Sequence, residues 1–413
     1  MNNSSGIHIV ELRLAGFRAF ENVRLRFDDL TVLVGRNGAG KSTLIDALEF
    51  IRDALNDSLE NALTRREGLS ALLHRGSKRA KELSVALTVR MSPAYLRAVT
   101  QRTGLVIAQQ HIREGVFATY GFQVIPSRGP KGFRVKYETV WLDTNEGSIG
   151  QFSKSSGWAR ISAGEGLGLP LFVPGQPTFQ LVLDALKTSV RAYRLSPEAI
   201  RQEPLIGRTS ILRRNGDNAG DVLHYIESNK KDLAWITKHL AAITPGISRI
   251  KSGTAAGRRL IQFFQQGGKS SKVRFDIRDM SDGTLRCLAI LIALRQTPSP
   301  ALVCIEEIED SVHPAALGVL LDAVASSTRR CQVLLTSHSP EALSHPAVTP
   351  ERVRVIQWRN GRSQLYRLSE GAEEMSRPPR SVGKLLRSNA LFTADEPESV
   401  ESGFFTRFFD PRA

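Results

Sequence analysis

The stretch LVGRNGAGKSTL, residues 33–44, decides the fold of this chain. Residues 35–42 fit the pattern G-x-x-x-x-G-K-[ST] at every position. Glycines in this pattern allow a tight loop whose backbone N–H groups point at phosphate oxygens, while the lysine reaches the β- and γ-phosphates and the hydroxyl coordinates Mg²⁺. The apolar run 30–34 predicts a buried strand before the loop, and the helical spacing of apolar residues over 42–55 predicts a helix after it. The sequence therefore predicts a phosphate-binding loop.

We expect the whole loop to contact a nucleotide. Its residues are Gly35, Arg36, Asn37, Gly38, Ala39, Gly40, Lys41, Ser42 and Thr43. Among them, Lys41 is the candidate for contact with the reacting phosphate, and Ser42 is a candidate magnesium ligand.

A second apolar strand is predicted at residues 301–305 and ends in two carboxylates, Glu306 and Glu307. Phosphoryl transfer needs one group that holds Mg²⁺ and another that orients the attacking water. Successive residues at the end of a strand point to opposite sides, so Glu306 suits the metal and Glu307 suits the water. An acidic helix cap is the alternative for the nearby Glu309 and Asp310.

Two further segments carry polar groups at the ends of predicted elements. An apolar strand from Val333 ends at His338, where an α/β sheet presents its ligand site, although a lone histidine is often structural. The segment 279–286, DMSDGTLR, precedes an apolar helix, and Ser281 and Gly283 can offer donors to an anion at the helix start. A simple capped turn is the alternative for this segment.

The hydrophobic pattern divides the chain into strand-rich and helix-rich parts. Alternating apolar residues predict strands near 7–14, 23–27, 85–89, 117–124, 135–142, 260–264 and 273–277. Residues 143–176 are rich in Gly, Ser and Pro and predict a loop, whereas 180–243 has helical periodicity. From about 277 to 368 helix and strand alternate, which is typical of a largely parallel sheet.

Composition and charge limit the class of protein. A chain of 413 residues exceeds what one core usually supports, so two or three lobes are expected. We find neither a signal peptide nor an apolar run near the roughly 20 residues that span a bilayer, and we expect a cytoplasmic protein without a membrane segment. Cys287, Cys304 and Cys331 lack paired spacing and fit buried apolar positions better than a disulfide or zinc site.

The net charge of +15, from 56 basic and 41 acidic residues, suits a polyanionic partner such as nucleic acid, although a generally basic proteome is the alternative. Four basic clusters can form a nucleic-acid face if they converge in space, and each can equally be an ordinary solvated surface. They are Arg65–Arg66, His74–Lys81, Arg128–Lys136 and Arg213–Arg214.

In their order along the chain, the phosphate loop, the SDG helix start, the IEE strand and the TSH strand resemble ABC-type ATPase heads. The opening LRLAGFRAFENVRLRF resembles the branch that includes RecF, the SMC proteins and the OLD-like "AAA family ATPases" of bacteria. The resemblance implies an α/β P-loop fold, with a mixed sheet of central parallel strands, an antiparallel β subdomain and an inserted helical lobe. Its expected parts are the N-terminal half of the head (1–150), an insertion (151–250), the C-terminal half (251–375) and a tail (376–413).

The resemblance also implies roles for particular residues, with ATP and Mg²⁺ as cofactors. Glu306 matches the magnesium-associated acid, and Glu307 matches the glutamate that polarises water. His338 matches the histidine that senses the γ-phosphate. Ser281 and Gly283 match the signature motif, which reaches the γ-phosphate of the ATP bound to the opposite subunit.

Some positions match the family less well. Arg18, in GFRAF, matches a basic residue that approaches the nucleotide. Asp282 places a negative charge where transporter heads have glycine, and we expect it to point away from phosphate or to contact a neighbouring loop. We find no glutamine for a Q-loop, and His74 or Arg75 is a guess from position alone.

By resemblance we expect an ATPase that forms a homodimer or higher oligomer on ATP and controls a separate effector, a nuclease or toxin, in anti-phage defence. The middle of the chain is too short for an SMC coiled coil, and the tail lacks the acidic clusters of a TOPRIM nuclease. A RecF-like DNA-repair ATPase and a nucleotide-switch scaffold with incidental hydrolysis are the alternatives.

Overall fold

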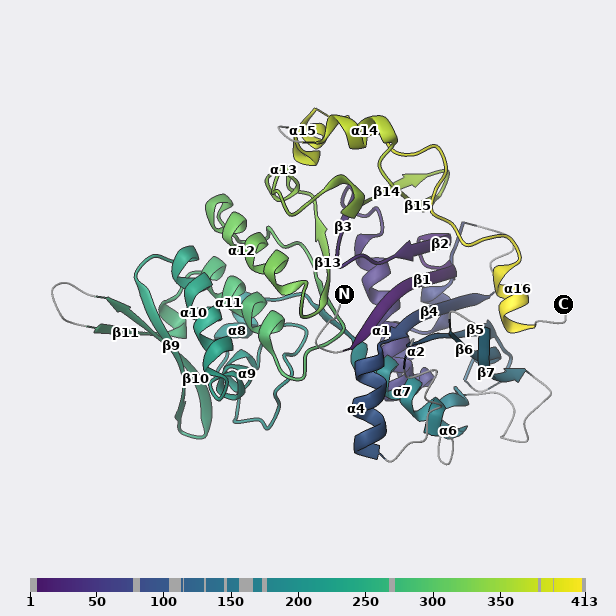
Figure 1. Ribbon diagram of the computed structural model, residues 1–413, viewed down its shortest axis with the longest axis horizontal. Coiled ribbons are helices and arrows are strands. Elements are labelled where there is room, and N and C mark those ends of the chain that lie inside the picture. Colours follow the sequence, from purple (N-terminus) through teal and green to yellow (C-terminus); the bar gives the residue numbers. More distant parts are fainter. Residues whose placement is uncertain are drawn as a thin grey trace.

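The computed structural model describes residues 6–76, 82–103, 113, 115–129, 131–144, 147–155, 166–172, 177–266, 272–377, 380–388 and 390–410. Three sheets organise this part of the chain (Figure 1). Two are six-stranded and one is three-stranded, and helices cover them as expected for the predicted α/β class.

The central sheet has the strand order β15-β14-β3-β13-β12-β8. Its members are β3 (Leu30–Val34), β8 (Val190–Tyr193), β12 (Leu302–Ile305), β13 (Gln332–Ser337), β14 (Val353–Arg359) and β15 (Arg362–Tyr366). All neighbouring pairs are parallel except β14 with the edge strand β15. The carboxyl ends of β3, β12 and β13 therefore meet at one edge, where α/β sheets hold their ligands.

The central sheet separates two hydrophobic cores. Along β13, Leu334 packs into one core, whereas Val333 and Leu335 pack into the other. Along β12, Cys304 and Val303 divide in the same way. This follows from the two-residue period of a strand, and it explains why both faces of these strands are apolar.

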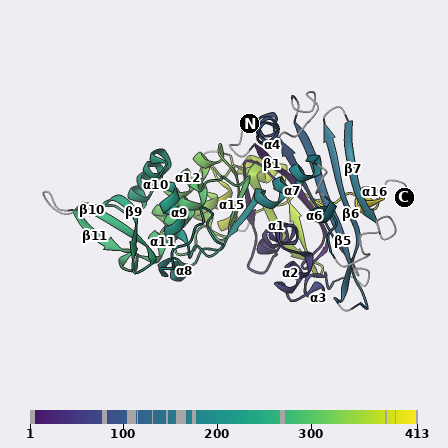
Figure 2. The same cartoon turned by 90° about the horizontal axis from the view of Figure 1, so that it is seen from below.

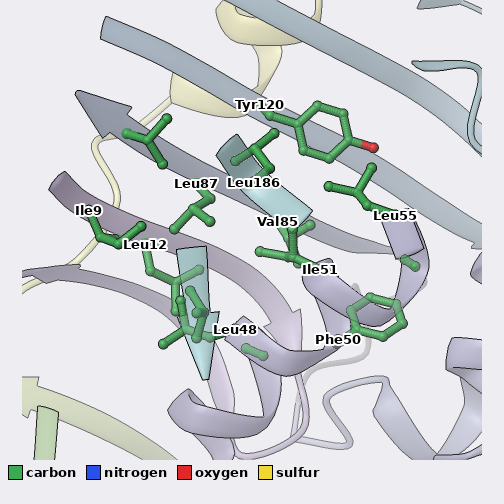
Figure 3. Close-up of a cluster of buried hydrophobic side chains, with 14 of the residues drawn as sticks. Ile9, Leu12, Leu48, Phe50, Ile51, Leu55, Val85, Leu87, Tyr120 and Leu186 are labelled. Atoms are coloured by element: carbon green, nitrogen blue, oxygen red, sulfur yellow. The ribbon is translucent and has the colours of Figure 1, made fainter. Parts of the chain in front are cut away.

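The first core lies under an antiparallel sheet of order β2-β1-β4-β5-β6-β7. Its strands are β1 (Ile7–Phe17), β2 (Phe20–Arg26), β4 (Leu83–Met91), β5 (Val116–Pro126), β6 (Phe133–Thr144) and β7 (Gly147–Ser155). Figure 3 shows Leu48, Ile51 and Leu55 of helix α1 (Lys41–Asn56) beside side chains of β1, β4 and β5. Leu186 of α7 (Pro177–Ser189) lies in the same cluster.

The second core lies under α11 (Asp282–Arg295) and α12 (Pro314–Ser327) and includes a three-stranded sheet. That sheet has the order β11-β10-β9, and it extends from one end of the molecule, opposite the C-terminal helix (Figures 1 and 2). Its strands are β9 (Ile247–Ala255), β10 (Arg258–Gln266) and β11 (Lys272–Asp276). Helices α8 (Pro197–Arg201), α9 (Ala219–Ile226) and α10 (Lys230–Ile243) complete this lobe.

Short helices connect and cover these layers. They are α2 (Leu59–Thr64), α3 (Leu69–Leu72), α4 (Pro93–Thr103), α6 (Leu169–Phe172), α13 (Pro340–Leu343), α14 (Glu370–Met375), α15 (Val382–Arg387) and α16 (Phe404–Phe409), with the 3₁₀ turns η1 (Ile277–Asp279) and η2 (Pro350–Arg352). Helix α16 packs on the outer face of the antiparallel sheet, where Phe409 stacks on Tyr137 and Trp141 donates to the carbonyl of Phe408 at 3.0 Å.

Two of the sequence expectations were wrong. Residues 147–155, expected to be loop, form β7 and pair with β6, although part of the predicted 143–176 loop lies outside the described residues. Residues 190–193, expected to be helical, form β8. The strand Val190–Tyr193 is only four residues long and lies between helices. Alternation over so few residues cannot be distinguished from the helical periodicity on either side.

One expectation about local elements is confirmed. The strand, loop and helix around residues 30–56 form as predicted. Cys287, Cys304 and Cys331 are free and buried. No helix among the described residues is both long and apolar enough to cross a bilayer.

Candidate functional site

The phosphate loop follows β3 and leads into α1. Gly38 and Gly40 have φ angles of +78° and +111°, which L side chains rarely adopt. A Cβ on Gly35 would lie 2.6 Å from the carbonyl oxygen of Ile356 on the neighbouring strand. Gly40 caps α1 without a side chain, so no side-chain acceptor covers the first N–H groups of the helix. These N–H groups form an anion site.

Lys41 lies against the loop that precedes it. Its Nζ donates to the carbonyl oxygens of Gly35 and Arg36 at 2.6 and 3.2 Å. Burial lowers the pKa of Lys41, and the carboxylates of Glu307 and Glu309 oppose this shift. The buried ammonium of Lys41 and the uncapped N-terminus of α1 are both positive, and a triphosphate would stabilise both. The loop therefore fits a nucleotide.

Ser42 and Glu306 meet across the edge of the central sheet. The Ser42 hydroxyl donates to Oε2 of Glu306 at 2.7 Å, although the residues are 264 positions apart. Glu306 is buried, with 4% of its surface exposed. A hydroxyl and a carboxylate are oxygen donors of the kind that Mg²⁺ takes alongside substrate phosphates. The pair therefore fits the predicted magnesium position.

Glu307 differs from Glu306 in both exposure and backbone. It is exposed while Glu306 is buried, which agrees with the expectation that the two side chains point to different sides. Its φ of +47° is unusual for a non-glycine residue. The backbone N–H of Glu307 donates to Oγ1 of Thr336 at 2.8 Å, so β13 fixes this turn.

His338 lies beside the loop and is paired with Glu309. Its Nδ1 is 3.0 Å from Oε1 of Glu309, and its backbone N–H donates to the same oxygen at 2.6 Å. The proposed acidic cap does not form, because His313 caps α12. Glu309 instead orients the histidine, a role that the sequence analysis missed.

A cavity of about 780 Å³ lies beside the outer side of the loop. It is lined by residues 34–39, His338, residues 355–359 of β14, Leu386 and Leu391. A second cavity, of about 470 Å³, contains Glu306 and Glu307 together with Arg194, at the end of β8, and Arg286. The guessed His74 lies elsewhere: its Nδ1 contacts the carbonyl oxygen of Arg18 at 2.6 Å.

Two arginines to which the sequence analysis gave no role at the acidic strand end hold the turn with the two glutamates. Arg214 contacts Oε1 of Glu306 at 2.8 Å and also pairs with Glu49 of α1. Arg286, 2% exposed, donates to the carbonyl oxygens of Glu306 and Glu307, each at 2.8 Å. Arg286 is the last residue of the quoted segment 279–286, and Arg214 was considered only as part of a basic cluster for nucleic acid.

The serine motif forms the start of α11. Ser281 caps this helix, because its Oγ accepts from the N–H of Thr284 at 3.3 Å. A Cβ on Gly283 would lie 2.5 Å from the carbonyl oxygen of Ser311. Asp282 pairs with Arg201 of α8 at 2.5 Å, so it contacts a neighbouring segment as expected. Neither Ser281 nor Gly283 lines the cavity beside the phosphate loop of its own chain.

Arg18 lies at the turn between β1 and β2. Its guanidinium is 3.1 Å from Asp46, on the helix that follows the phosphate loop. Within one chain, Arg18 therefore contacts the flank of α1, and its predicted approach to the nucleotide stays a prediction.

Comparisons with known proteins agree with this geometry. A family model described as "AAA ATPase domain" matches residues 8–86. A second, described as "AAA domain, putative AbiEii toxin, Type IV TA system", matches residues 208–344. No curated protein matches the chain.

Solved SMC heads share the fold. An SMC head bound to the C-winged helix domain of ScpA has a TM-score of 0.55 at 17% identity, covering 88% of this chain and 99% of that one. A Pyrococcus furiosus SMC head bound to the C-terminal domain of ScpA has a TM-score of 0.50 at 17% identity, covering 89% and 98%. The two family models mark the chain as an ATPase, and its fold is that of solved SMC heads.

Proposed function

We propose that the chain binds ATP and Mg²⁺ at the phosphate loop and hydrolyses the ATP between two closed copies of itself. The observation that carries this proposal is the contact of Ser42 with Glu306, because it joins the loop to the acidic strand end beside a desolvated Lys41. Bound Mg²⁺ would neutralise charge on the phosphates. Lys41 and Ser42 hold the triphosphate and metal, with Glu306 as the metal-associated acid.

In this proposal Glu307 orients the attacking water. Its exposed carboxylate lies near Lys41, since the two influence each other electrostatically, and Thr336 fixes its backbone. His338 lines the cavity next to the loop and is held by Glu309. The hydrolytic groups are therefore supplied by three neighbouring strand ends, those of β3, β12 and β13.

The second copy supplies the serine motif. Ser281 caps the 14-residue helix α11 and Gly283 lies in its first turn, and neither lines the cavity beside the phosphate loop of its own chain. Facing the triphosphate of a partner copy, the N-terminus of this helix would place its positive dipole end toward an anion. Closure would then depend on nucleotide.

We further propose that closure, in the cytoplasm, reports nucleic acid or another sign of invasion to a separate effector in anti-phage defence. The type IV toxin–antitoxin description of one matching family supports an effector, and the SMC heads bound to ScpA domains support a partner protein. Phage should form plaques less efficiently on bacteria that carry the gene with its neighbouring genes than on bacteria that lack them. The Lys41→Ala substitution should remove this protection. Equal plating of the two strains would contradict a defence role.

Glu307→Gln tests the ATPase proposal. We expect the variant to keep ATP binding and to lose most hydrolysis, about 100-fold, because removal of one well-placed group costs a few kcal/mol in the transition state. It should accumulate as an ATP-dependent dimer in light scattering after size exclusion.

Lys41→Ala is the control for Glu307→Gln. It should lose nucleotide binding and stay undimerised with ATP, because the desolvated ammonium beside the loop is gone. Normal hydrolysis by Glu307→Gln would overturn the assignment of Glu307, and a monomeric Glu307→Gln protein saturated with ATP would overturn closure.

A further inference from the structure

The three-stranded sheet β9–β11 has one covered face and one open face. The covered face carries Ile250, Ile261 and Phe263, all buried in the second core. The described helices α9 and α10 contact this sheet. The residues in between point the other way, because side chains alternate along a strand. The open face therefore consists of residues such as Arg249, Lys251 and Phe264, and the first two are exposed.

The strand register places these residues in rows. Phe264 pairs with Arg249 on one side and with Arg274 on the other, so an aromatic ring stands between two arginines. The guanidinium carbon of Arg249 is 5.6 Å from the centroid of the Phe264 ring. Gln262 pairs with Lys251 in the next row, about 7 Å away along the strand.

Charge is segregated between the two faces. On the covered side, Arg259 is paired with Asp221 at 3.2 Å, and Glu227 accepts from Ser252. On the open side, neither Arg249 nor Lys251 forms an ion pair within the described residues. Arg274 is 4.0 Å from Asp276, which lies on the same face because it pairs with Gln262. Arg249, Lys251 and Arg274 outnumber Asp276 on this face, so it is positive, and Arg249 and Lys251 are available to an anionic partner.

Three of the four basic clusters singled out in the sequence contain cations that are already paired, and residues 77–81 of the fourth lie outside the described residues. Arg65 pairs with Asp57 at 2.7 Å, and Lys131 pairs with Glu60 at 2.7 Å. Arg213 pairs with Asp217 at 3.2 Å, and Arg214 is committed to the metal-associated acid. Intramolecular carboxylates already neutralise these cations, so they are poorer candidates for a nucleic-acid face.

We propose that the open face of β9–β11 binds single-stranded nucleic acid, with phosphates on Arg249, Lys251 and Arg274 and a base stacked on Phe264. A cationic surface with an aromatic ring at its centre fits unpaired bases on a charged backbone, as in other single-strand binders. The inference rests on the nucleic-acid sensing of the proposed function and assigns that sensing to the open face of β9–β11. β11 runs through η1 directly into Ser281, so the face adjoins the serine motif.

The double variant Arg249→Glu/Arg274→Glu tests the face. Lys230→Glu/Lys231→Glu is the matched control, because it makes the same charge change at two exposed lysines of α10 in the same lobe. The probes are labelled oligothymidylate, oligouridylate and a DNA duplex of matched length, followed by fluorescence anisotropy with basal ATPase measured in parallel. We expect binding to weaken at least about tenfold in the first variant, while the control changes about twofold or less.

Phe264→Ala should weaken single-strand binding about tenfold, since a stacked base contributes on the order of 1–3 kcal/mol, and Phe264→Trp should restore it. The salt slope of the arginine variant should fall by about 1.4, the value for two lost phosphate contacts. Oligothymidylate and oligouridylate binding distinguishes DNA from RNA as the source of the strand.

Equal losses in the arginine variant and its control would overturn the assignment of this face. A clear preference for duplex over both single strands, or no binding by the wild-type chain at low salt, would overturn it as well. Normal basal ATPase in these cases would leave the ATP-hydrolysis proposal standing. Loss of ATPase with intact strand binding would instead count against that proposal alone.

Discussion

Arg214 joins two carboxylates from different parts of the chain, Glu49 of α1 and Glu306 of the β12 turn. Burial lowers the pKa of Arg214, but these two carboxylates outweigh it, and the net pKa is raised. Burial raises the pKa of Glu49, and Arg214 is the largest of the charges that oppose this shift. Arg214 also belongs to the segment before α9, in the second lobe. One guanidinium therefore connects that lobe to the candidate metal site.

Arg214→Ala should change the response to Mg²⁺ more than the affinity for ATP. Without the arginine the Glu306 carboxylate loses one of its two fixed contacts, and loss of such an orienting partner costs roughly 10- to 100-fold in metal affinity or activity. The measurement is ATPase rate against Mg²⁺ concentration. Arg213→Ala is the control, because Arg213 is the adjacent arginine and pairs with Asp217 on the surface. An Arg214→Ala protein with the Mg²⁺ profile of the control would refute the role.

At single positions, the sequence revealed groups that belong to a compact motif and missed groups that act over long separations. Lys41 and Ser42 lie within eight consecutive residues, and the structure brings Ser42 to Glu306. Glu49 stands out in no motif, because it faces Arg214 from 165 positions away. Glu309 was assigned to a cap for the same reason: its contact with His338 spans 29 positions.

At the scale of elements, the central strands were predictable and β8 was not. β3 and β13 have apolar centres and are buried along their whole length, a signal that stands out from their surroundings. β8 follows α7 without a break, and its edge pairing with β12 determines its conformation. Tertiary context overrides local propensity in so short a strand. The missed strand matters, because Arg194 at its end reaches the cavity of the two glutamates.

Helix α11 shows how one element links the serine motif to the acidic turn. Its hydrophobic residues are buried almost all round, as expected for a helix inside a lobe. Arg286 is the buried exception, and burial lowers its pKa. It also donates to the carbonyl oxygen of Leu195, after β8, at 2.6 Å. A shift of α11 would therefore be felt at both Glu306 and Glu307, which couples the two halves of the proposed dimer site.

At the scale of the whole molecule, the central sheet makes the two cores interdependent. Adjacent residues of β13 serve different cores, with Leu334 on the side of α1 and Leu335 on the side of α11. Both are fully or almost fully buried, at 0% and 1% exposure. If one lobe unfolded alone, it would expose one face of the central sheet to water while the other lobe still packed on the opposite face. The molecule should therefore lose both cores together.

Leu334→Ala and Leu335→Ala test this interdependence as a matched pair. Each truncation leaves a cavity in a different core and should cost about 2 to 5 kcal/mol of unfolding free energy. Because the strand is shared, we expect differential scanning calorimetry to show one transition for the wild-type chain, and both variants to lower that same transition. ATP with Mg²⁺ at about 100 times its dissociation constant should raise the transition, by a stabilisation near 2.7 kcal/mol. Two separate transitions, each lowered by only one of the variants, would mean that the lobes unfold independently and that the sheet belongs energetically to one of them.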